Sequence, residues 1–481
     1  MSVSRRGAPG IPEPLGLSDR VVTLRRRATQ HLRAGKRARA PGTARPGVTL
    51  AAGFAGLITV GTILLMLPFA SESGGTDFIT ALFTATSAVC VTGLTVVSTA
   101  DHWTAFGEGV ILALIQVGAL GFVTGAVVIL TLAGRRTSSR EHLLFGQPLG
   151  LDQPGGLLGL IWRVAALTLF AEAVGFGFVL WYATGDADIE NPLWWSAFHA
   201  ISAFTNAGFN VEPGAASMGR LVDATNILAT FGVLSVLGGV GFTVIFDGLR
   251  RRSWRRLSLE SKLVLTTMLV VSLVGFVVLW ILTPTFGGAI ADDDLGGRTV
   301  TAAFHTINRT AGLSTVDLGA LGLDAWTAIM LLMFIGGASA SVAGGVTLNT
   351  VGVLAVAAVS HIRGHRSPTA FGRTIATVTV IRALTVVLLS AMAVFLATLV
   401  MSVAERESGH PLGNLLFESI SAFAVVGYST GITPDLSVVS KTVLVIAMFV
   451  GRLGALTLAQ ALVTRERPEL IRFPEETIKV G

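Results

Sequence analysis

Charged residues are scarce in this chain of 481 residues. Only 13% of the residues are charged, whereas 52% are hydrophobic, and the mean hydropathy is +0.71. Because soluble domains carry roughly 25% charged residues, the composition excludes an ordinary soluble protein and indicates a membrane protein. Cysteine is scarcer still. Cys90 is the single one, so the chain forms no internal disulfide, and Cys90 lacks the partners of a metal site.

Motifs of catalysis are also missing from the sequence. It contains no phosphate-binding Walker sequence and no HExxH zinc motif, and no arrangement of Ser, His and Asp suggests a hydrolase. The glycine run "GGVG" (238–241) lies inside a hydrophobic run, which does not fit the strand-to-helix turn of a dinucleotide site. We therefore expect neither an enzyme nor a covalently bound cofactor.

Long hydrophobic runs dominate the sequence instead. A helix needs about 20 apolar residues to cross the roughly 30 Å of hydrocarbon in a bilayer. Eight runs approach or exceed this length, at about 49–70, 106–133, 158–183, 221–248, 262–285, 323–357, 374–402 and 438–463. They are too long for the strands of a membrane barrel. The sequence therefore predicts an all-α membrane protein with eight transmembrane helices.

The net charge of +6 is distributed unevenly along the chain. Basic clusters lie in residues 1–48, 135–140, 250–256, 363–366 and 465–472, and the connections between them are acidic or neutral. This alternation follows the positive-inside rule and argues against a nucleic-acid partner. It predicts that both termini are cytoplasmic. Residues 1–48 lack the hydrophobic stretch of a signal peptide and are predicted to be a basic cytoplasmic arm.

A short pattern occurs four times between the long runs, always on the side predicted to be external. The four copies are "ALFTATSAVCVTGLT" (81–95), "AFHAISAFTNAGFN" (197–210), "AAFHTINRTAGLST" (302–315) and "LFESISAFAVVGYST" (416–430). Their glycines are Gly93, Gly208, Gly312 and Gly427, which are 115, 104 and 115 residues apart. The segments are too short to cross a bilayer, so each is either interfacial or re-entrant.

Four such segments in register predict a shared axis. Non-helical backbone at membrane depth is tolerated only where protein or a water-filled cavity surrounds it. The C-terminal end of a short helix favours a cation, and a glycine lets the following carbonyls face the axis. Rings of carbonyls replace the hydration shell of the ion in K⁺ filters. One such stretch alone is usually a turn, but four in register favour a pore.

With these motifs the sequence resembles the Trk/Ktr/HKT superfamily of potassium transporters, and within it the Ktr-type membrane (pore-forming) subunit. The resemblance covers about residues 50–481 and includes "FIGGASASVAGGVT", "MFVGRLGALTLAQAL" and the tail "RFPEETIKVG", which favours the Ktr branch. It implies four tandem helix–pore-loop–helix repeats around a pseudo-fourfold central pore. It also implies a homodimer in the lipid bilayer of the cell membrane, controlled by a cytosolic ring of nucleotide-binding regulatory subunits.

Position by position, the resemblance implies a K⁺ selectivity filter of four strands. Its residues are Val91, Thr92, Gly93 and Leu94; Asn206, Ala207, Gly208 and Phe209; Thr310, Ala311, Gly312 and Leu313; and Val425, Val426, Gly427 and Tyr428. K⁺ is then the substrate ion, and Na⁺ is a second candidate. Each strand has one glycine where tetrameric K⁺ channels have two, so we expect weaker discrimination against Na⁺. Acidic residues that follow the strands would line the entrance: Asp101, Glu212, Asp317 and Asp435.

A glycine-rich stretch interrupts the sixth hydrophobic run. Each glycine in a helix interior costs up to about 1 kcal/mol relative to alanine, although small residues also serve close helix packing. The resemblance implies an intramembrane gate loop formed by Gly336, Gly337, Ala338, Ser339, Ser341, Gly344, Gly345 and Thr347. The family commonly has a lysine where this chain has Thr347.

Three charged residues inside the apolar regions are singled out as well. Arg452, in the eighth run, is either a second part of the gate that contacts loop carbonyls or one half of a structural ion pair. Arg309 and Glu418 lie in the third and fourth pore segments, and we expect them to form a buried scaffold pair.

The repeats define the expected organisation of the chain. Repeat 1 occupies residues 49–134, repeat 2 occupies 158–249, repeat 3 with the gate loop occupies 262–360, repeat 4 occupies 371–465, and a cytoplasmic tail occupies 466–481. Two functions remain open. One is a gated K⁺-conducting subunit, and the other is a carrier that couples K⁺ to Na⁺ or H⁺ by alternating access. The fourfold repeat favours the first.

Overall fold

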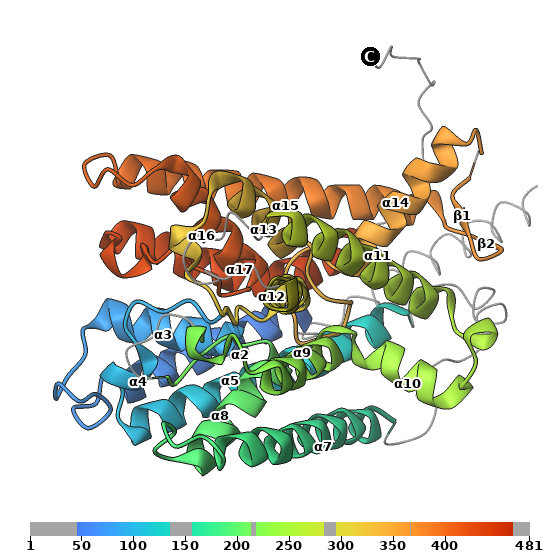
Figure 1. Ribbon diagram of the computed structural model, residues 1–481. Coiled ribbons are helices and arrows are strands. Elements are labelled where there is room, and N and C mark those ends of the chain that lie inside the picture. The colour runs from blue at the N-terminus through green and yellow to red at the C-terminus, as the bar shows by residue number, and fades with distance from the viewer. Residues whose placement is uncertain (1–45, 135–155, 213–217, 283–294, 366, 465–481) are drawn as a thin grey trace, which may run out of the picture. The chain divides into compact units, whose positions relative to one another are not determined.

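The computed structural model describes residues 46–134, 156–212, 218–282, 295–365 and 367–464 (Figure 1). Residues Leu50–Gly481 form one compact unit. The predicted basic arm (1–48) falls almost wholly outside the described residues, and the predicted tail (466–481) falls outside them entirely.

Helices account for nearly all of the regular structure. The α-helices are α2 (Pro46–Leu65), α3 (Phe78–Cys90), α4 (Thr99–His102), α5 (Ala105–Gly134), α7 (Gly156–Ala183), α8 (Pro192–Thr205), α9 (Thr225–Gly239), α10 (Phe242–Arg251), α11 (Leu259–Leu282), α12 (Leu295–Ile307), α13 (Leu323–Phe334), α14 (Leu348–Ile362), α15 (Thr377–Ala404), α16 (Leu412–Ala424) and α17 (Val438–Thr464). Short 3₁₀ turns are η1 (Gly219–Leu221), η2 (Trp254–Arg256), η4 (Asn308–Thr310), η5 (Leu318–Ala320) and η6 (Thr433–Asp435). Strands β1 (Thr369–Ala370) and β2 (Arg373–Thr374) pair antiparallel.

The prediction of a helical membrane protein is confirmed. Within the described residues, five helices are long and apolar enough to cross a membrane: Gly47–Leu65, Ala105–Gly125, Ile161–Ala183, Leu259–Leu282 and Thr377–Ala404. The pair α9 and α10, bent by 91°, is either a sixth, broken span or a re-entrant segment. Large hydrophobic side chains on these helices are exposed, as a lipid environment requires.

Two of the eight predicted runs are not single helices. The fourth run breaks between α9 and α10, where Gly241 has a φ of 89° that few other residues adopt. The sixth run is divided into α13 and α14 by residues 335–347, which we call the glycine loop. The interruption of the sixth run was expected from its glycines, whereas the break between α9 and α10 was not, and the expectation of one continuous helix in the fourth run was therefore wrong.

Four short helices, α3, α8, α12 and α16, lie at the predicted positions before the four glycines. Side chains cap two of them, since Asp77 accepts a hydrogen bond from the Thr80 N–H and Asn191 accepts one from the Trp194 N–H. Three of these helices, α3, α8 and α16, are largely buried, and α12 is buried in its C-terminal half. The burial fits their place inside the unit rather than on its surface.

The long helices connect the repeats into a cycle. The second long helix of each repeat packs against the short helix of the next one: α5 on α8, α9 on α12, α13 on α16, and α17 back on α3. In Figure 1 the first two repeats and the fourth occupy separate layers, with α12 between them. The ends of the four short helices are thereby brought to one place.

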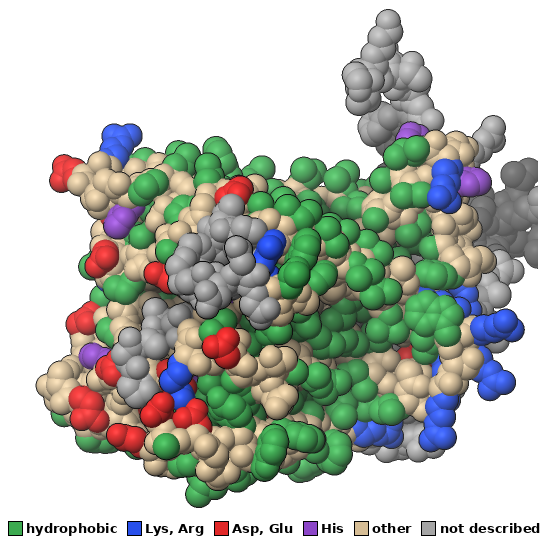
Figure 2. All heavy atoms as spheres, viewed as in Figure 1, with side chains coloured by type: hydrophobic (Ala, Val, Ile, Leu, Met, Phe, Trp, Pro, Cys, Tyr) green, Lys and Arg blue, Asp and Glu red, His purple; other side chains and the backbone are tan. Residues whose placement is uncertain are grey.

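Charge separates along the helices. Figure 2 shows hydrophobic side chains over the middle of the visible face, acidic side chains gathered at its left end and most Lys and Arg side chains at its right end. The basic end includes arginines in the last turn of α10 and just after it, from Arg250 to Arg256. This distribution is the one expected of a protein with two polar ends and an apolar belt.

Candidate functional site

Each short helix ends abruptly before its glycine. In three repeats the capping residue is left-handed: Val91 has a φ of 60°, Asn206 of 58° and Val425 of 57°. The cap N–H groups and those that follow them bond to carbonyls in the last helical turn, which stops the helix. Left-handed valine is strained, and such strain is concentrated at functional sites. In the third repeat, η4 ends the helix instead.

The four glycine strands meet in a closed cycle. A side-chain carbon placed on Gly93 would collide with the carbonyl oxygen of Ala207, and one on Gly208 would collide with that of Ala311. Likewise, Gly312 faces the Val426 oxygen and Gly427 faces the Thr92 oxygen, so the fourth strand returns to the first. We call Gly93, Gly208, Gly312 and Gly427, with these four oxygens, the glycine ring.

Access to solvent within each strand is restricted to the glycine. All four ring glycines are partly exposed, while the other twelve predicted filter residues are buried. Because glycine has no side chain, the accessible surface at this level is backbone. The four strands therefore expose backbone peptide groups at the glycine ring, and the side chains of the other filter residues are buried in the surrounding protein.

Hydrogen bonds hold neighbouring strands together. The Thr310 hydroxyl donates to Asn206 Oδ1 at 2.9 Å, and the Tyr428 hydroxyl donates to the Leu313 carbonyl at 3.2 Å. These bonds join the third strand to the second and the fourth to the third. The buried tyrosine hydroxyl thereby gains the partner that its burial requires.

A hydroxyl six positions before the glycine supports three of the strands. The Gly93 and Gly427 N–H groups donate to Ser87 Oγ and Ser421 Oγ at 3.1 Å, and Ser202 Oγ donates to the Phe209 carbonyl at 2.8 Å. We missed these serines in the sequence. The signal was present, because each repeat has Ser or Thr at that position.

A second set of buried polar groups holds the residue two positions after the glycine. His199 bonds to Asn210 at 3.0 Å and His305 bonds to Ser314 at 3.0 Å. Glu418 is fully buried in the fourth repeat, where its Oε1 accepts from Ser429 Oγ at 2.8 Å. Polar side chains on the short helices thus set the course of three strands beyond the ring.

The expected pair between Arg309 and Glu418 does not form. Glu418 accepts four hydrogen bonds from residues 429–433, which satisfy both of its carboxylate oxygens. Arg309 Nη2 instead donates to the Gly336 carbonyl at 3.5 Å, and no described residue forms an ion pair with it. The pairing was wrong because hydroxyl and backbone groups close to Glu418 already satisfy its carboxylate, while Arg309 turns toward the carbonyl of Gly336.

The glycine loop folds back on itself between α13 and α14. The Gly336 N–H donates to the Val346 carbonyl at 2.9 Å, and the Leu348 N–H donates to the Gly337 carbonyl at 2.8 Å. Gly345, with a φ of 78°, makes the turn that these bonds need. A side-chain carbon on Gly344 would lie 2.6 Å from the Ala424 carbonyl, so the loop lies against the C-terminal end of α16.

The loop also bonds to the break in the fourth run. The Ala338 N–H donates to the Gly239 carbonyl at 2.8 Å, and the Val342 N–H donates to the Gly238 carbonyl at 3.2 Å. Two irregular segments satisfy each other's backbone groups, which apolar surroundings would otherwise leave unpaired. Of the other predicted gate residues, the Ser339 N–H donates to Asn349 Oδ1, Ser341 is buried, and Thr347 caps α14 by accepting from the Thr350 N–H.

Arg452 contacts the loop directly. It is only 1% exposed, and its Nη1 donates to the Val342 carbonyl at 2.6 Å. Its guanidinium lies 4.3 Å from the centroid of the Phe122 ring. Within the described part of the chain, Nε and Nη2 have no hydrogen-bond partner. Among the described residues, the Val342 carbonyl and the Phe122 ring are therefore the groups that stabilise this buried cation.

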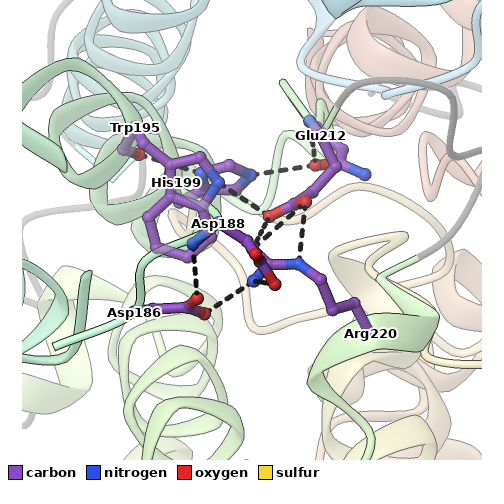
Figure 3. A network of polar contacts seen from close by, with 7 residues as sticks. Asp186, Asp188, Trp195, His199, Glu212 and Arg220 are labelled. Carbon is purple, nitrogen blue, oxygen red and sulfur yellow. Dashed lines mark hydrogen bonds and ion pairs between the residues drawn. The ribbon is translucent and has the colours of Figure 1, made fainter. Parts of the chain in front are cut away.

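The acidic residues expected at the entrance are not all free. Figure 3 shows Glu212 and Arg220 facing each other, and Arg220 Nη2 lies 3.0 Å from Glu212 Oε1. Glu212 also accepts from Trp195 Nε1 at 2.8 Å, so its charge is neutralised. Asp317 caps η5 and Asp101 accepts from the Ser98 hydroxyl, whereas Asp435 is exposed.

Asp186 completes this network from the end of α7. Its carboxylate lies 2.6 Å from Arg220 Nη1. Burial opposes ionisation of Asp186, but the Asp188 N–H and the Arg220 guanidinium outweigh it and lower the pKa of the carboxyl below its ordinary value. The network joins the α7–α8 connection of repeat 2 to its α8–α9 connection through charged groups.

Similarity to known proteins agrees with this geometry. The model of the TrkH family, described as a cation transport protein, matches residues 28–469. The chain is 35% identical to the Ktr system potassium uptake protein B of Bacillus subtilis over 438 residues, which cover 91% of this chain and 97% of the relative. It is 34% identical to the potassium/sodium uptake protein NtpJ of Enterococcus hirae over 445 residues, with the same two shares.

A solved structure has the same fold. The crystal structure of the potassium transporter TrkH from Vibrio parahaemolyticus superposes with a TM-score of 0.69, at 18% identity, over 89% of this chain and 86% of that one. The chain belongs to the TrkH family of cation transport proteins. The resemblance found in the sequence is confirmed, and so is the prediction that the protein is a transporter and not an enzyme.

Proposed function

We propose that the chain is the pore-forming subunit of a potassium uptake system, with eight membrane crossings in four repeats around one central pathway. The glycine ring is the observation that carries the proposal. Four backbone strands converge there, and only their glycines are accessible. The names of the relatives, a potassium uptake protein and a potassium/sodium uptake protein, support K⁺ as the substrate and Na⁺ as a second candidate.

The ring has the chemistry of a K⁺ filter. Carbonyl oxygens replace the hydration shell of an ion without binding it so tightly that it cannot leave. The helix ends that point toward the ring add partial negative charge. The described residues contain no cluster of three or more His, Cys, Asp or Glu side chains that could hold a metal ion. The sixteen residues assigned to the filter from the sequence are the ones we propose to line it.

We further propose that the glycine loop and Arg452 form the gate. Support comes from the Arg452–Val342 bond, which joins a buried cation to the loop. In this arrangement the guanidinium repels cations, and release of the bond would let the loop move. Thr347 caps α14, so it would act on the gate by fixing where the helix begins.

The surroundings of the pore are proposed from the resemblance and from the charge distribution. The two polar ends, one acidic and one basic, support cytoplasmic termini in the cell membrane under the positive-inside rule. The name "Ktr system" of a relative supports a multi-component assembly. We propose a homodimer that binds a cytosolic ring of nucleotide-binding subunits.

Flux measurements with one glycine variant test the proposal. The chain is reconstituted in liposomes, and K⁺, Rb⁺ and Na⁺ fluxes are compared between the natural chain and Gly312→Ser. Gly312 has a φ of 67° and faces the Val426 carbonyl, so any side chain displaces the fourth strand. Gly121→Ala is the matched control, because nothing lies within 4 Å of its added carbon. We expect passive K⁺ and Rb⁺ flux whose selectivity changes in Gly312→Ser alone.

A carrier coupled to Na⁺ or H⁺ is the competing function. The breaks at α9–α10 and α13–α14 resemble the discontinuous helices of such carriers. In the same liposomes, K⁺ movement that requires a second ion gradient would favour the carrier and overturn the pore. If no flux occurs at all, the cytosolic ring of regulatory subunits is added. The absence of K⁺ flux with these subunits bound would contradict the proposal.

A further inference from the structure

Glu172 is a buried carboxylate that the proposed pore does not use. It lies in α7, eleven residues from either end of the apolar span Ile161–Ala183. At 1.5 Å per residue this places it about 16 Å from both ends, at the middle of the membrane. The side chain is 5% exposed. Acidic side chains at this depth are rare and mark ion or proton sites.

One hydrogen bond is all that the described residues offer Glu172. Gln116 Nε2, from the middle of α5, donates to Glu172 Oε2 at 2.9 Å. Glu172 Oε1 has no partner, and neither has Gln116 Oε1, although both atoms are inaccessible to solvent. No cation of the described chain forms an ion pair with Glu172. The ionised form of Glu172 is thus short of positive charge among the described residues.

Thr168 adds a third unpartnered oxygen. It precedes Glu172 by one helical turn, so the two side chains share a face of α7. Other threonines in these helices donate to the carbonyl one turn back, as Thr62 does to Ile58 and Thr205 does to Ile201. Thr168 is 1% exposed, and its hydroxyl has no partner within the described part of the chain.

We propose that Glu172, Gln116 and Thr168 form a second cation site, for Na⁺, between α5 and α7 and outside the glycine ring. Three hard oxygens, one of them charged, suit a small alkali cation and would be satisfied by it together. The direct bond between Gln116 and Glu172 keeps the side chains close, which favours Na⁺ over the larger K⁺. This inference does not depend on the proposed filter.

The site has a physical connection to the ring. Gly118, two residues after Gln116, packs directly on the Val89 carbonyl at the end of α3. Gly175, three residues after Glu172, packs on Leu234 of α9. An ion that holds α5 against α7 therefore acts on two helices that contact the short helices of repeats 1 and 2.

Binding of radioactive sodium to the purified chain tests the site. An excess of K⁺ is present to compete at the ring, and the variants are Glu172→Gln and Thr168→Val. We expect about one K⁺-resistant Na⁺ per natural chain, and an affinity at least about tenfold lower in Glu172→Gln because the charge is lost. Thr168→Val, which keeps shape and removes one oxygen, should weaken binding by a smaller factor.

Glu108→Gln is the matched control. Glu108 is another buried carboxylate of α5, but it accepts a hydrogen bond from Trp194 Nε1 and lies at the end of the helix. Its variant should bind Na⁺ like the natural chain. Unchanged Na⁺ binding in both Glu172→Gln and Thr168→Val, or no K⁺-resistant binding by the natural chain, would overturn the site and leave Glu172 as a protonated link between helices. Failure of the proposed pore would show in the Gly312→Ser fluxes and not here.

Discussion

Repeats 1, 2 and 4 end their short helices in the same way, and repeat 3 differs from them. In the three similar repeats a left-handed residue ends the short helix, whereas α12 ends in the 3₁₀ turn η4. In repeat 3 the long helix that follows is divided by the glycine loop into α13 and α14, and in repeat 2 the corresponding helix is divided only by the short break between α9 and α10. Both features of repeat 3 lie beside each other, since Arg309 of η4 donates to Gly336 of the loop.

One glycine in each repeat shows what the difference does. In repeats 1, 2 and 4 a glycine of the second long helix packs on a carbonyl oxygen at the end of the short helix: Gly118 on Val89, Gly238 on Phe204 and Gly451 on Phe423. In repeat 3 the corresponding Gly336 faces the Gly344 oxygen of its own loop. Three long helices are therefore packed tightly on the ends of short helices, whereas in repeat 3 the corresponding tight contact lies within the glycine loop.

The largest effect is expected from adding a side-chain carbon to one of these three tightly packed glycines. Gly451→Ala places a carbon against the Phe423 carbonyl, so α17 must shift away from α16. Overpacking of this kind costs about 1–3 kcal/mol. We expect a lower thermal unfolding temperature in detergent, with Gly121→Ala unchanged. A Gly451→Ala protein as stable as the natural chain would show that α17 is not held at this point.

A second prediction concerns Arg452, the buried cation that contacts the glycine loop of repeat 3. Arg452→Ala removes a charged hydrogen bond to Val342, and such bonds contribute about 1.5–3 kcal/mol. If the bond keeps the loop in place, the displaced loop becomes roughly ten times more populated or more. We expect K⁺ flux in the absence of any partner to rise accordingly. Arg452→Lys keeps the charge, so its K⁺ flux should lie between the fluxes of the natural chain and of Arg452→Ala.

Unchanged or lower flux in a folded Arg452→Ala protein would assign Arg452 to structure instead of gating. Folding is checked in the same sample by gel filtration. This outcome would also contradict the idea that the glycine loop of repeat 3 acts as a gate.

A smaller effect is expected from the strand supports, which the repeats build with different side chains. Glu418→Gln keeps the shape but replaces one acceptor oxygen by an N–H₂ group beside Thr433. Leaving a buried group unpaired costs about 1–3 kcal/mol. We expect altered K⁺ to Na⁺ selectivity with the fold retained. Equal selectivity in Glu418→Gln and the natural chain would contradict a role of Glu418 in positioning the fourth strand.

The sequence was sufficient where the repeat fixes the backbone. The four glycines, the short helices before them and the interruption at 335–347 follow from local patterns, because only glycine tolerates both the positive φ and the close approach. The break between α9 and α10 was missed, although "GGVG" (238–241) signalled it. There the glycines were considered only as a nucleotide motif.

Side-chain partners could not be predicted from the repeat. Arg309 was paired with Glu418 by repeat order alone, yet η4 rotates Arg309 toward the loop. Glu212 was expected to be free because the repeated pattern contains no partner for it. Its partner, Arg220, comes from η1, which lies outside that pattern. Which polar groups meet depends on helix ends and connections, and these vary between repeats that share the same glycine.

The smallest effect is expected at the connections, where repeats 2 and 4 each use an acid after the first long helix. Glu405 follows α15, and its Oε1 accepts from the Ser437 N–H at 2.8 Å, just before α17. Burial opposes its ionisation, but hydrogen bonds from Ser437 and Ser440 outweigh this and lower the pKa to about 2, against an ordinary value of 4.5. A lowered pKa stabilises the folded state above the unfolded pKa, and the stabilisation is lost as the pH falls toward the folded pKa. The natural chain should therefore unfold at a higher temperature than Glu405→Gln. This difference should be largest at neutral pH and decrease as the pH falls from about 4.5 toward about 2. A difference that stays constant over this range would show that the Glu405 charge does not fasten the start of α17.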